Sequence, residues 1–195
     1  MPLFFYHTAM AGKGLVQIYT GLGKGKTTAA LGVALRAAGW GKKVIIYQFL
    51  KPPALVLGER KAITKSKLPI KIVPVDIKWN MQKKNNTASA VAKAMANKLV
   101  CDKIDQTCKE IQTVARKGKY DIIILDEIIF CLSKKLVSLE RIKKIIKAKQ
   151  KLVEIILTGR GATKDIIKLA DLVTEMKEVK HPFRKNVKAR KGIEY

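Results

Sequence analysis

The segment at residues 15–31, LVQIYTGLGKGKTTAAL, constrains most strongly how this chain can fold. The mostly apolar residues at 15–19 are typical of a buried strand, and the alanine-rich stretch that begins near residue 26 is typical of a helix. Between them, Gly21, Gly23 and Gly25 allow a tight turn that aims several backbone N–H groups inward. A strand, a glycine-rich turn and a helix in this order form a cradle for phosphate groups, because the positive end of the helix dipole points at the same place.

The side chains that follow the turn suit a nucleoside triphosphate. Lys26 supplies an ammonium group for the outer phosphates, and the Thr27 hydroxyl stands where a phosphate-bound Mg²⁺ would be coordinated. The usual pattern is a glycine, four residues and then Gly-Lys-Ser/Thr, and here Thr20 occupies the first glycine position. The alternative is a glycine-rich connection with a chance lysine, which the preceding strand and the following helix disfavour. We therefore expect the chain to bind a nucleoside triphosphate.

A second chemical signature follows the most apolar segment of the chain. Residues 121–125, DIIIL, predict a central parallel strand, and Asp126 and Glu127 come directly after it. At the carboxyl end of a parallel sheet these acids face the cradle, so one can bind Mg²⁺ and the other is free to act as a base or a second metal contact. The alternative is a solvated acidic turn. Arg160, which follows another predicted strand, is expected to contact phosphates or to lock the neighbouring loop, unless it is a surface arginine in a turn.

Strand and helix patterns alternate along the chain, which predicts an α/β fold: a single-domain P-loop NTPase-like fold with a mostly parallel β-sheet of five or six strands and helices on both faces. Strands are expected at 15–19, 43–49, 71–75, 121–125 and 152–157, with 172–175 as the candidate sixth. Helices are expected at 26–38, 88–117, 138–148 and 163–170, with a loop region at 51–69, polar irregular residues at 76–87 and a basic tail at 180–195. Residues 1–13 are expected to form a short extension before one domain at 14–195.

Composition limits the remaining classes of function. The 195 residues are 48% hydrophobic, which suffices for one domain with a substantial core, and no apolar run reaches the length of a transmembrane helix. The N-terminus lacks the basic and apolar regions of a secretory signal, so a cytoplasmic location without membrane contact is expected. Three cysteines and two distant histidines favour neither a disulfide framework nor a zinc site. Cys101 and Cys108 are seven residues apart, so they are expected to pack in the core from one helix face.

The net charge of +25 predicts attraction to polyanions. Most of the excess comes from lysine, which lacks the bidentate grip of arginine on phosphate, and the lysines are spread along the chain. We therefore expect solvated lysine faces, and contact with nucleic acid that is at most non-specific.

Together these motifs resemble the P-loop type of cob(I)alamin (corrinoid) adenosyltransferase over nearly the whole chain. The P-loop alone is shared with many ATPases, so QFLK at 48–51 and KHPF at 180–183 are the more specific markers. The other markers are YTGLGKGKTT at 19–28, RA at 36–37 with Gly39 and Gly41, GER at 58–60, LDE at 125–127, TGRG at 158–161, LAD at 169–171 and GIEY at 192–195.

The resemblance implies transfer of the 5′-deoxyadenosyl group of ATP to the cobalt of a reduced corrinoid, with release of triphosphate. It implies that ATP is bound in the opposite sense to most P-loop enzymes, so that the cradle holds the leaving triphosphate. It also implies a homodimer and an electron-donor protein such as a flavodoxin. Carried onto this sequence, nucleotide binding falls on Gly21, Leu22, Gly23, Lys24, Gly25, Lys26, Thr27 and Thr28, with Arg36 and Arg160 as secondary contacts.

The same resemblance assigns the metal and catalytic roles. Thr27 and Glu127 would hold Mg²⁺ with support from Asp126, and Lys26 and Glu127 are the expected catalytic residues. Because Co(I) is already a strong nucleophile, the tasks left to the protein are to position the attack and to stabilise the departing triphosphate.

Several positions depart from the family pattern. Trp79 is expected to contact the corrinoid, although composition alone favours a hydrophobic anchor. Ile77 replaces a phenylalanine of the same family segment, and Leu22 replaces a usual asparagine in the cradle. Asn186 and Arg190 replace a usual glycine and a usual glutamine. Reduced activity or an altered corrinoid choice is therefore a hypothesis for this chain.

Two other functions stay open on the sequence. One is a P-loop ATP hydrolase with a polyanion (nucleic-acid) partner, in which Glu127 would orient water. The other is a non-catalytic module that binds ATP or a corrinoid, which the departures at Leu22 and Ile77 motivate. The phosphate product separates them, since a transferase releases triphosphate, a hydrolase releases ADP and phosphate, and a binding module releases neither.

Overall fold

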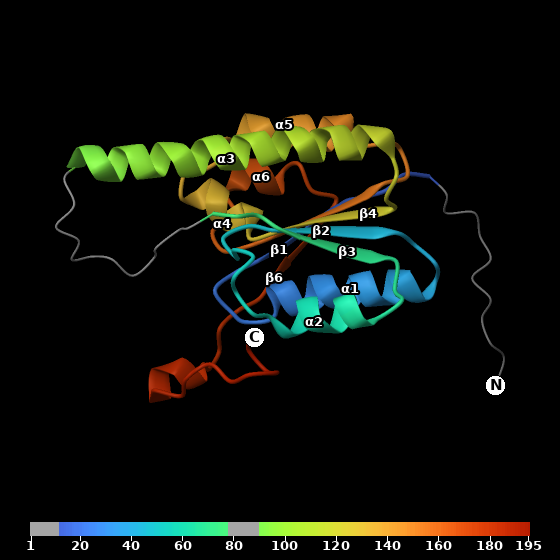
Figure 1. Cartoon of the computed structure of the whole chain (residues 1–195). Helices are drawn as coiled ribbons and strands as arrows, with labels where there is room; N and C mark the ends of the chain where they lie inside the picture. The colour runs from blue at the N-terminus through green and yellow to red at the C-terminus, as the bar shows by residue number, and fades with distance from the viewer. Residues whose placement is uncertain (1–11, 78–89) are drawn as a thin grey trace, which may run out of the picture.

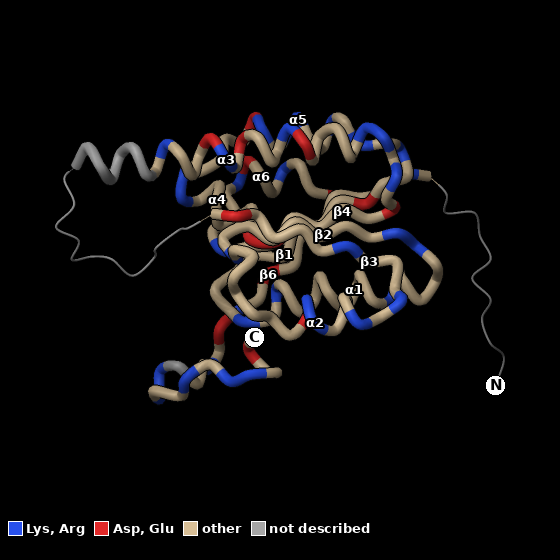
Figure 2. The backbone as a smooth tube through the Cα atoms, viewed as in Figure 1, with Lys and Arg blue, Asp and Glu red and all other residues tan. Residues whose placement is uncertain are grey.

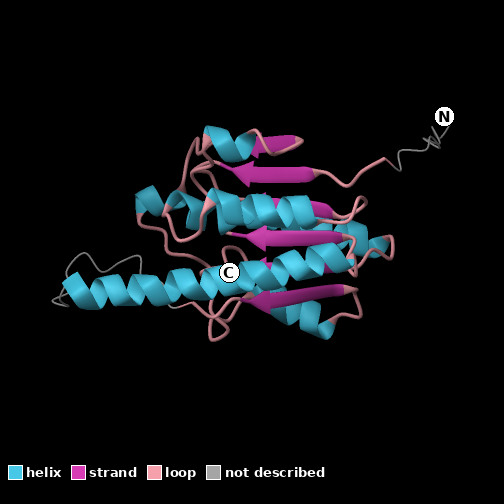
Figure 3. Ribbon diagram, turned by 90° about the horizontal axis from the view of Figure 1, so that it is seen from above, coloured by secondary structure: helices cyan, strands magenta, loops and turns pink. Residues whose placement is uncertain are grey.

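The computed structural model of the chain describes residues 12–77 and 90–195, without the side chains of residues 90–96 and 183. The described residues form a six-stranded sheet in the order β3-β2-β4-β5-β1-β6. Every neighbouring pair is parallel, and the strand arrows point the same way in Figure 3. The strands are β1 (Val16–Thr20), β2 (Val44–Gln48), β3 (Ile70–Pro74), β4 (Ile122–Asp126), β5 (Glu154–Thr158) and β6 (Leu172–Glu175). The predicted parallel α/β sheet, with 172–175 as its sixth strand, is confirmed.

Helices cover both faces of this sheet (Figure 1). One face carries α1 (Lys26–Gly39) and α2 (Gly58–Lys65). The other face carries α3 (Ala90–Lys117), α4 (Ile128–Ser133), α5 (Leu139–Ala148) and α6 (Lys164–Ile167). The tail contains one 3₁₀ turn, η1 (Pro182–Lys185), and folds back toward the sheet end from which α1 starts.

The first helix lies against the sheet through a stripe of alanines. Ala30, Ala34 and Ala38 are four residues apart, so they share one helix face, and all three are buried. Ala30 and Ala34 pack on the strand residues Tyr19, Val44, Ile46, Ile122, Ile124 and Ile156. The helix ends at Gly39, and the positive φ of 73° at Gly41 continues the turn, as the two glycines predicted.

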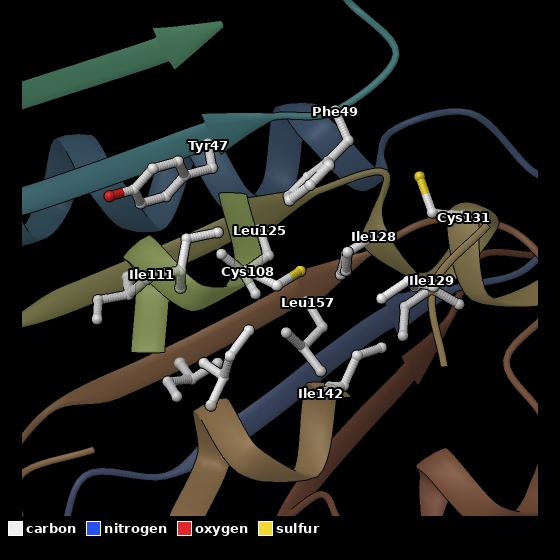
Figure 4. Packing of buried hydrophobic residues seen from close by; sticks show 14 of the residues in the cluster. Tyr47, Phe49, Cys108, Ile111, Leu125, Ile128, Ile129, Cys131, Ile142 and Leu157 are labelled. Atoms are coloured by element: carbon white, nitrogen blue, oxygen red, sulfur yellow. The ribbon is translucent and has the colours of Figure 1, made fainter. Parts of the chain in front are cut away.

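The larger part of the core lies on the opposite face (Figure 4). There Cys108 and Ile111 of α3 and Ile142 of α5 face Leu125 and Leu157 of the central strands, and all five are fully buried. Burial raises the pKa of the Cys108 thiol to about 12, so this cysteine acts as a small apolar side chain. The prediction that Cys108 packs in the core is confirmed, and the partly buried Cys101 packs against the same cluster.

Four elements differ from the sequence prediction, and one of them is the helix expected at 163–170, which spans only Lys164–Ile167. The loop predicted at 51–69 is wrong in its second half, where Gly58–Lys65 forms α2; none of its residues is fully buried, so no apolar period marks it. The helix α4 begins directly after Glu127 and was not predicted. The strand β5 begins at Glu154 rather than 152, because a turn closed by the Val153 N–H and the Gln150 carbonyl precedes it.

Lysine and arginine occur on the helices of both layers and on the tail (Figure 2). This distribution agrees with the even spread of lysines along the sequence. Within the described ranges, no helix is both long enough and apolar enough to cross a bilayer.

Candidate functional site

A cavity of about 380 Å³ lies where β1 runs into α1, at the carboxyl end of the parallel sheet. This is the place where α/β folds bind ligands, since the strand ends and helix N-termini meet there. The cavity brings together the glycine-rich turn, the end of β4, the loop after β2 and the tail. Its lining consists of Gly23, Lys24, Gly25, Lys26, Thr27, Thr28, Leu31, Lys51, Leu57, Gly58, Glu59, Glu127, Arg160, His181, Gly192, Ile193, Glu194 and Tyr195.

The glycine-rich turn is held against the residue that follows β6. Gly21 and Gly25 have φ values of 97° and 112°, which favour glycine. The Gly23 N–H donates to the Met176 carbonyl at 2.7 Å. A Cβ atom at Gly21 would lie 2.5 Å from that same carbonyl oxygen, and one at Gly23 would lie 2.6 Å from it. The turn therefore has room for glycine alone at these two positions.

The Lys26 side chain is buried beneath this turn. Its Nζ donates to the carbonyl of Gly21 at 2.9 Å and to that of Gly23 at 2.6 Å. Burial lowers the pKa of the Lys26 ammonium, and the nearby Arg160 lowers it further. The ammonium thus cross-links the cradle, and it can exchange these carbonyl oxygens for phosphate oxygens that enter the cavity.

Asp126, the last residue of β4, is the centre of the polar network. Its side chain is only 1% exposed, and its two oxygens accept three side-chain donors. Oδ1 accepts from the Thr27 hydroxyl at 2.8 Å and from the Thr158 hydroxyl at 2.7 Å. Oδ2 accepts from the Lys51 ammonium at 2.6 Å. These donors offset the cost of burying the carboxylate.

The next residue, Glu127, has a strained backbone and lines the cavity with its side chain. Its φ of 67° places it in the left-handed region, which costs a residue other than glycine about 1–3 kcal/mol. The Thr158 hydroxyl accepts its backbone N–H at 3.0 Å. Burial and the neighbouring Asp126 raise the pKa of the Glu127 carboxyl, while nearby lysines and Arg160 oppose that shift.

These oxygen atoms fit a magnesium ion. Mg²⁺ prefers oxygen ligands and is usually held by one or two carboxylates, with water completing its shell. Thr27 and Asp126 already hold a cation between them, since the Lys51 ammonium lies 3.3 Å from the Thr27 hydroxyl as well as 2.6 Å from Asp126. Among the described residues there is no group of three or more His, Cys, Asp or Glu side chains that could hold a metal.

A second network holds the loop between β2 and α2. Gln48 is fully buried; its amide group donates to Glu59 at 3.0 Å, and its carbonyl accepts from Arg60 at 2.7 Å. The Arg60 guanidinium also donates to the backbone carbonyls of Lys51, Pro52 and Leu55 at 2.6, 2.9 and 3.0 Å. One arginine therefore fixes the whole loop that carries Lys51.

The tail closes another side of the cavity through ion pairs. Glu194 accepts from Lys24 at 3.3 Å, and it also accepts the backbone N–H and the guanidinium of Arg190. These hydrogen bonds lower the pKa of the Glu194 carboxyl to about 2. The tail thereby contacts the glycine-rich turn by way of Lys24.

Comparison with known proteins places the chain that forms this cavity in a family. The model of the family described as ATP:corrinoid adenosyltransferase BtuR/CobO/CobP matches residues 12–195. The chain belongs to this family. It is 32% identical over 187 residues to the corrinoid adenosyltransferase of Escherichia coli (strain K12), covering 94% of this chain and 86% of that protein. It is 33% identical over 185 residues to the corrinoid adenosyltransferase CobA of Salmonella typhimurium (strain LT2), with the same two coverages.

A solved structure supports the fold independently. A KaiC-like protein from the hyperthermophilic archaeon Pyrococcus horikoshii OT3 superposes with a TM-score of 0.53 over 86% of this chain and 75% of that chain. Its sequence identity of 16% limits this similarity to the fold. The family and the P-loop NTPase-like fold predicted from the sequence are thus confirmed.

The structure gathers most of the predicted site residues but not all of them. Among the residues predicted to bind nucleotide, those at 23–28 and Arg160 line the cavity. Gly21 and Leu22 are not part of the lining, and the Leu22 side chain is exposed to solvent. Arg36 is exposed in the last turn of α1 and is not part of the lining. Trp79 lies outside the described residues.

Several site residues were missed by the sequence reasoning. Lys51, Glu59, Thr158 and the tail residues at 192–195 were quoted as family markers without a role. Their position inside the short motifs that carry the family resemblance was the available signal. What the sequence did not reveal is that these motifs converge on one cavity.

Proposed function

We propose that this protein transfers the 5′-deoxyadenosyl group of ATP to the Co(I) centre of a reduced corrinoid, cobalamin or a precursor, and releases triphosphate. The observation that carries the proposal is the cavity itself, in a chain that belongs to the adenosyltransferase family. It combines a phosphate cradle, a buried lysine and an oxygen site for a divalent cation within one space.

The cradle at residues 21–28 would hold the leaving triphosphate. Lys26 would exchange the Gly21 and Gly23 carbonyls for phosphate oxygens, and residues 26–28 at the N-terminus of α1 line the same cavity. These groups favour the step because negative charge builds up on the triphosphate as the bond to the adenosyl carbon breaks. Arg160 and Lys24, which line the cavity, add positive charge near the same oxygens.

Mg²⁺ fits the Thr27 hydroxyl and the Glu127 carboxylate, with Asp126 in support. When bound, the ion would neutralise part of the triphosphate charge. Glu127 suits this role because burial and Asp126 make its negative charge costly, so a divalent cation would be favoured beside it. Catalytic roles are therefore assigned to Lys26 and Glu127.

No general base is needed on the cobalt side, because Co(I) is itself the nucleophile. The remaining protein task is to place the corrinoid in line with the adenosyl carbon. Trp79 is proposed to contact the corrinoid, and the buried Ile77 lies two residues before it in the core. A homodimer, an electron-donor protein such as a flavodoxin and a cytoplasmic location complete the proposal.

The test is an anaerobic assay with MgATP and chemically reduced cobalamin. The expected product has a cobalt–carbon bond that light destroys, and the phosphate product is triphosphate. Lys26→Met should reduce the rate at least about a hundredfold. Lys61→Met, an exposed lysine of α2 outside the cavity lining, should leave it unchanged. ADP and free phosphate without an alkylated corrinoid would instead indicate a P-loop hydrolase. Binding of ATP or corrinoid without any product would indicate a non-catalytic binding module.

A further inference from the structure

Lys51 is the one cavity-lining side chain among the described residues that forms an ion pair with Asp126. Its Nζ lies 2.6 Å from Asp126 Oδ2 and 3.3 Å from the Thr27 hydroxyl. Those two residues are also part of the oxygen set that fits Mg²⁺. The ammonium group therefore occupies the neighbourhood that the metal ion would need.

The backbone on both sides of Lys51 determines where its ammonium group lies. Leu50 has a φ of 57°, a left-handed conformation that turns the chain directly before Lys51. The Phe49 N–H donates to the Asp126 carbonyl at 3.0 Å, which ties the start of the loop to the end of β4. The Arg60 guanidinium holds the Lys51 carbonyl at 2.6 Å. A left-handed residue and two hydrogen bonds thus fix the backbone from which the lysine reaches Asp126.

We infer that Lys51 is an internal counter-ion of the Thr27–Asp126 pair, which holds the magnesium position in the nucleotide-free protein and leaves it when Mg²⁺ and triphosphate enter. The inference rests on the proposed function only in its use of a Mg²⁺ site. It also relates the QFLK and GER motifs to each other, because β2 and α2 together position Lys51 beside the metal site.

Of the three donors to Asp126, only Lys51 is free to move away. Thr27 and Thr158 have short side chains fixed by the first turn of α1 and by β5. The lysine has a long flexible stem, its side chain is 21% exposed to solvent, and it lines the cavity. Since the backbone of Lys51 is clamped, the ammonium can swing into the cavity without moving the loop. There it would meet triphosphate oxygens, so its charge would be paired in both states.

The test measures divalent cation binding to the nucleotide-free protein, with Mn²⁺ as the paramagnetic probe in electron spin resonance titrations. Lys51→Met removes the competing ammonium, so Mn²⁺ should bind about tenfold more tightly than to the wild type. The melting temperature of Lys51→Met should also rise more on addition of Mg²⁺ than that of the wild type, because the metal then replaces the lost partner of Asp126. Unchanged or weaker Mn²⁺ binding would overturn the inference.

Two further variants separate position from charge. Lys24→Met removes an equal charge from the cavity lining without touching Asp126, so its Mn²⁺ affinity should change less than about threefold. Arg60→Lys keeps the charge but loses the guanidinium fork, and should bind Mn²⁺ more tightly than the wild type because Lys51 is no longer held in place. If Lys24→Met bound Mn²⁺ as much more tightly as Lys51→Met does, the loss of any positive charge from the cavity would explain the effect, and the inference would be wrong. Circular dichroism would verify that each variant folds. If Lys51→Met does not fold, the Mn²⁺ affinity of Arg60→Lys tests the inference instead.

The metal titration is independent of adenosyl transfer. Absence of an alkylated corrinoid would contradict the proposed function, but the Mn²⁺ affinity of Lys51→Met would still test the inference. Adenosyl transfer by the wild type, together with an unaltered Mn²⁺ affinity of Lys51→Met, would contradict the inference alone.

Discussion

Two segments contribute residues to the cavity lining, and they are held in place by different means. The glycine-rich turn at 21–25 depends on backbone geometry: positive φ angles, a backbone hydrogen bond to Met176 and close approach to its carbonyl. The loop at 51–57 depends on side chains, because Arg60, Gln48 and Glu59 hold it through a buried network. The first segment tolerates almost no added atom, whereas the second depends on one particular guanidinium group.

The difference matches the tasks proposed above for the two segments. A triphosphate cradle must present its N–H groups in a fixed array before the ligand arrives, and backbone constraints achieve this. A lysine that exchanges one partner for another needs a fixed base and a free end, which a clamped backbone with a long side chain supplies. Substitutions in one segment should therefore leave the other intact.

The largest effect is expected at the turn. Gly21→Ala puts a Cβ atom 2.5 Å from the Met176 carbonyl oxygen on a residue with a φ of 97°, so it should cost about 3 kcal/mol or more of unfolding free energy and abolish ATP binding. Denaturant unfolding and nucleotide titration measure both. Gly32→Ala is the matched control: nothing lies within 4 Å of its added Cβ, and it should stabilise α1 by about 0.5–1 kcal/mol. Equal effects at the two glycines would refute the backbone argument.

A smaller effect is expected at the loop. Arg60→Ala removes the donor shared by the buried Gln48 and four backbone carbonyls, so unfolding free energy should fall by about 1–3 kcal/mol. ATP binding to the cradle should persist, because the turn at 21–25 does not contact Arg60. The exposed neighbour Lys61→Ala should stay within about 0.5 kcal/mol of the wild type in the same denaturant experiment. Loss of ATP binding in Arg60→Ala would mean that the two segments are not independent.

The smallest effect is expected at the tail, whose contact with the turn is electrostatic. Glu194 has a pKa of about 2 in the folded protein, against an ordinary value of 4.5, so its carboxylate stabilises the fold above pH 4.5. That contribution disappears as the pH falls from about 4.5 to about 2. Melting temperatures of the wild type and of Glu194→Gln should therefore differ slightly at pH 7 and converge near pH 2, and added salt should narrow the gap at pH 7. A difference that grows on acidification would contradict this assignment.

The same contrast explains what could be predicted from the sequence. Gly21, Gly23 and Gly25 could be recognised because a local backbone requirement leaves a local pattern of residue types. The parallel sheet could be predicted for the same reason, because the apolar residues of each strand and most helices follow a local period. Lys51 could not be given a role, because its partner Asp126 comes from another strand and its clamp comes from α2. An exposed short helix such as α2 carries no apolar period, so the element that supplies Arg60 was itself missed.

The position of β1 inside the sheet has a consequence for the synthesis of the protein. β1 is flanked by β5 and β6, so the strand that begins first has no neighbour until residues 154–175 have left the ribosome. At typical translation rates the wait between Thr20 and Glu154 lasts roughly 7 to 27 seconds. Throughout that time β1 lacks its neighbouring strands, and the glycine-rich turn lacks the Met176 carbonyl that accepts the Gly23 N–H in the folded protein. We therefore expect nucleotide to bind only late in synthesis and chaperones to protect β1 until then.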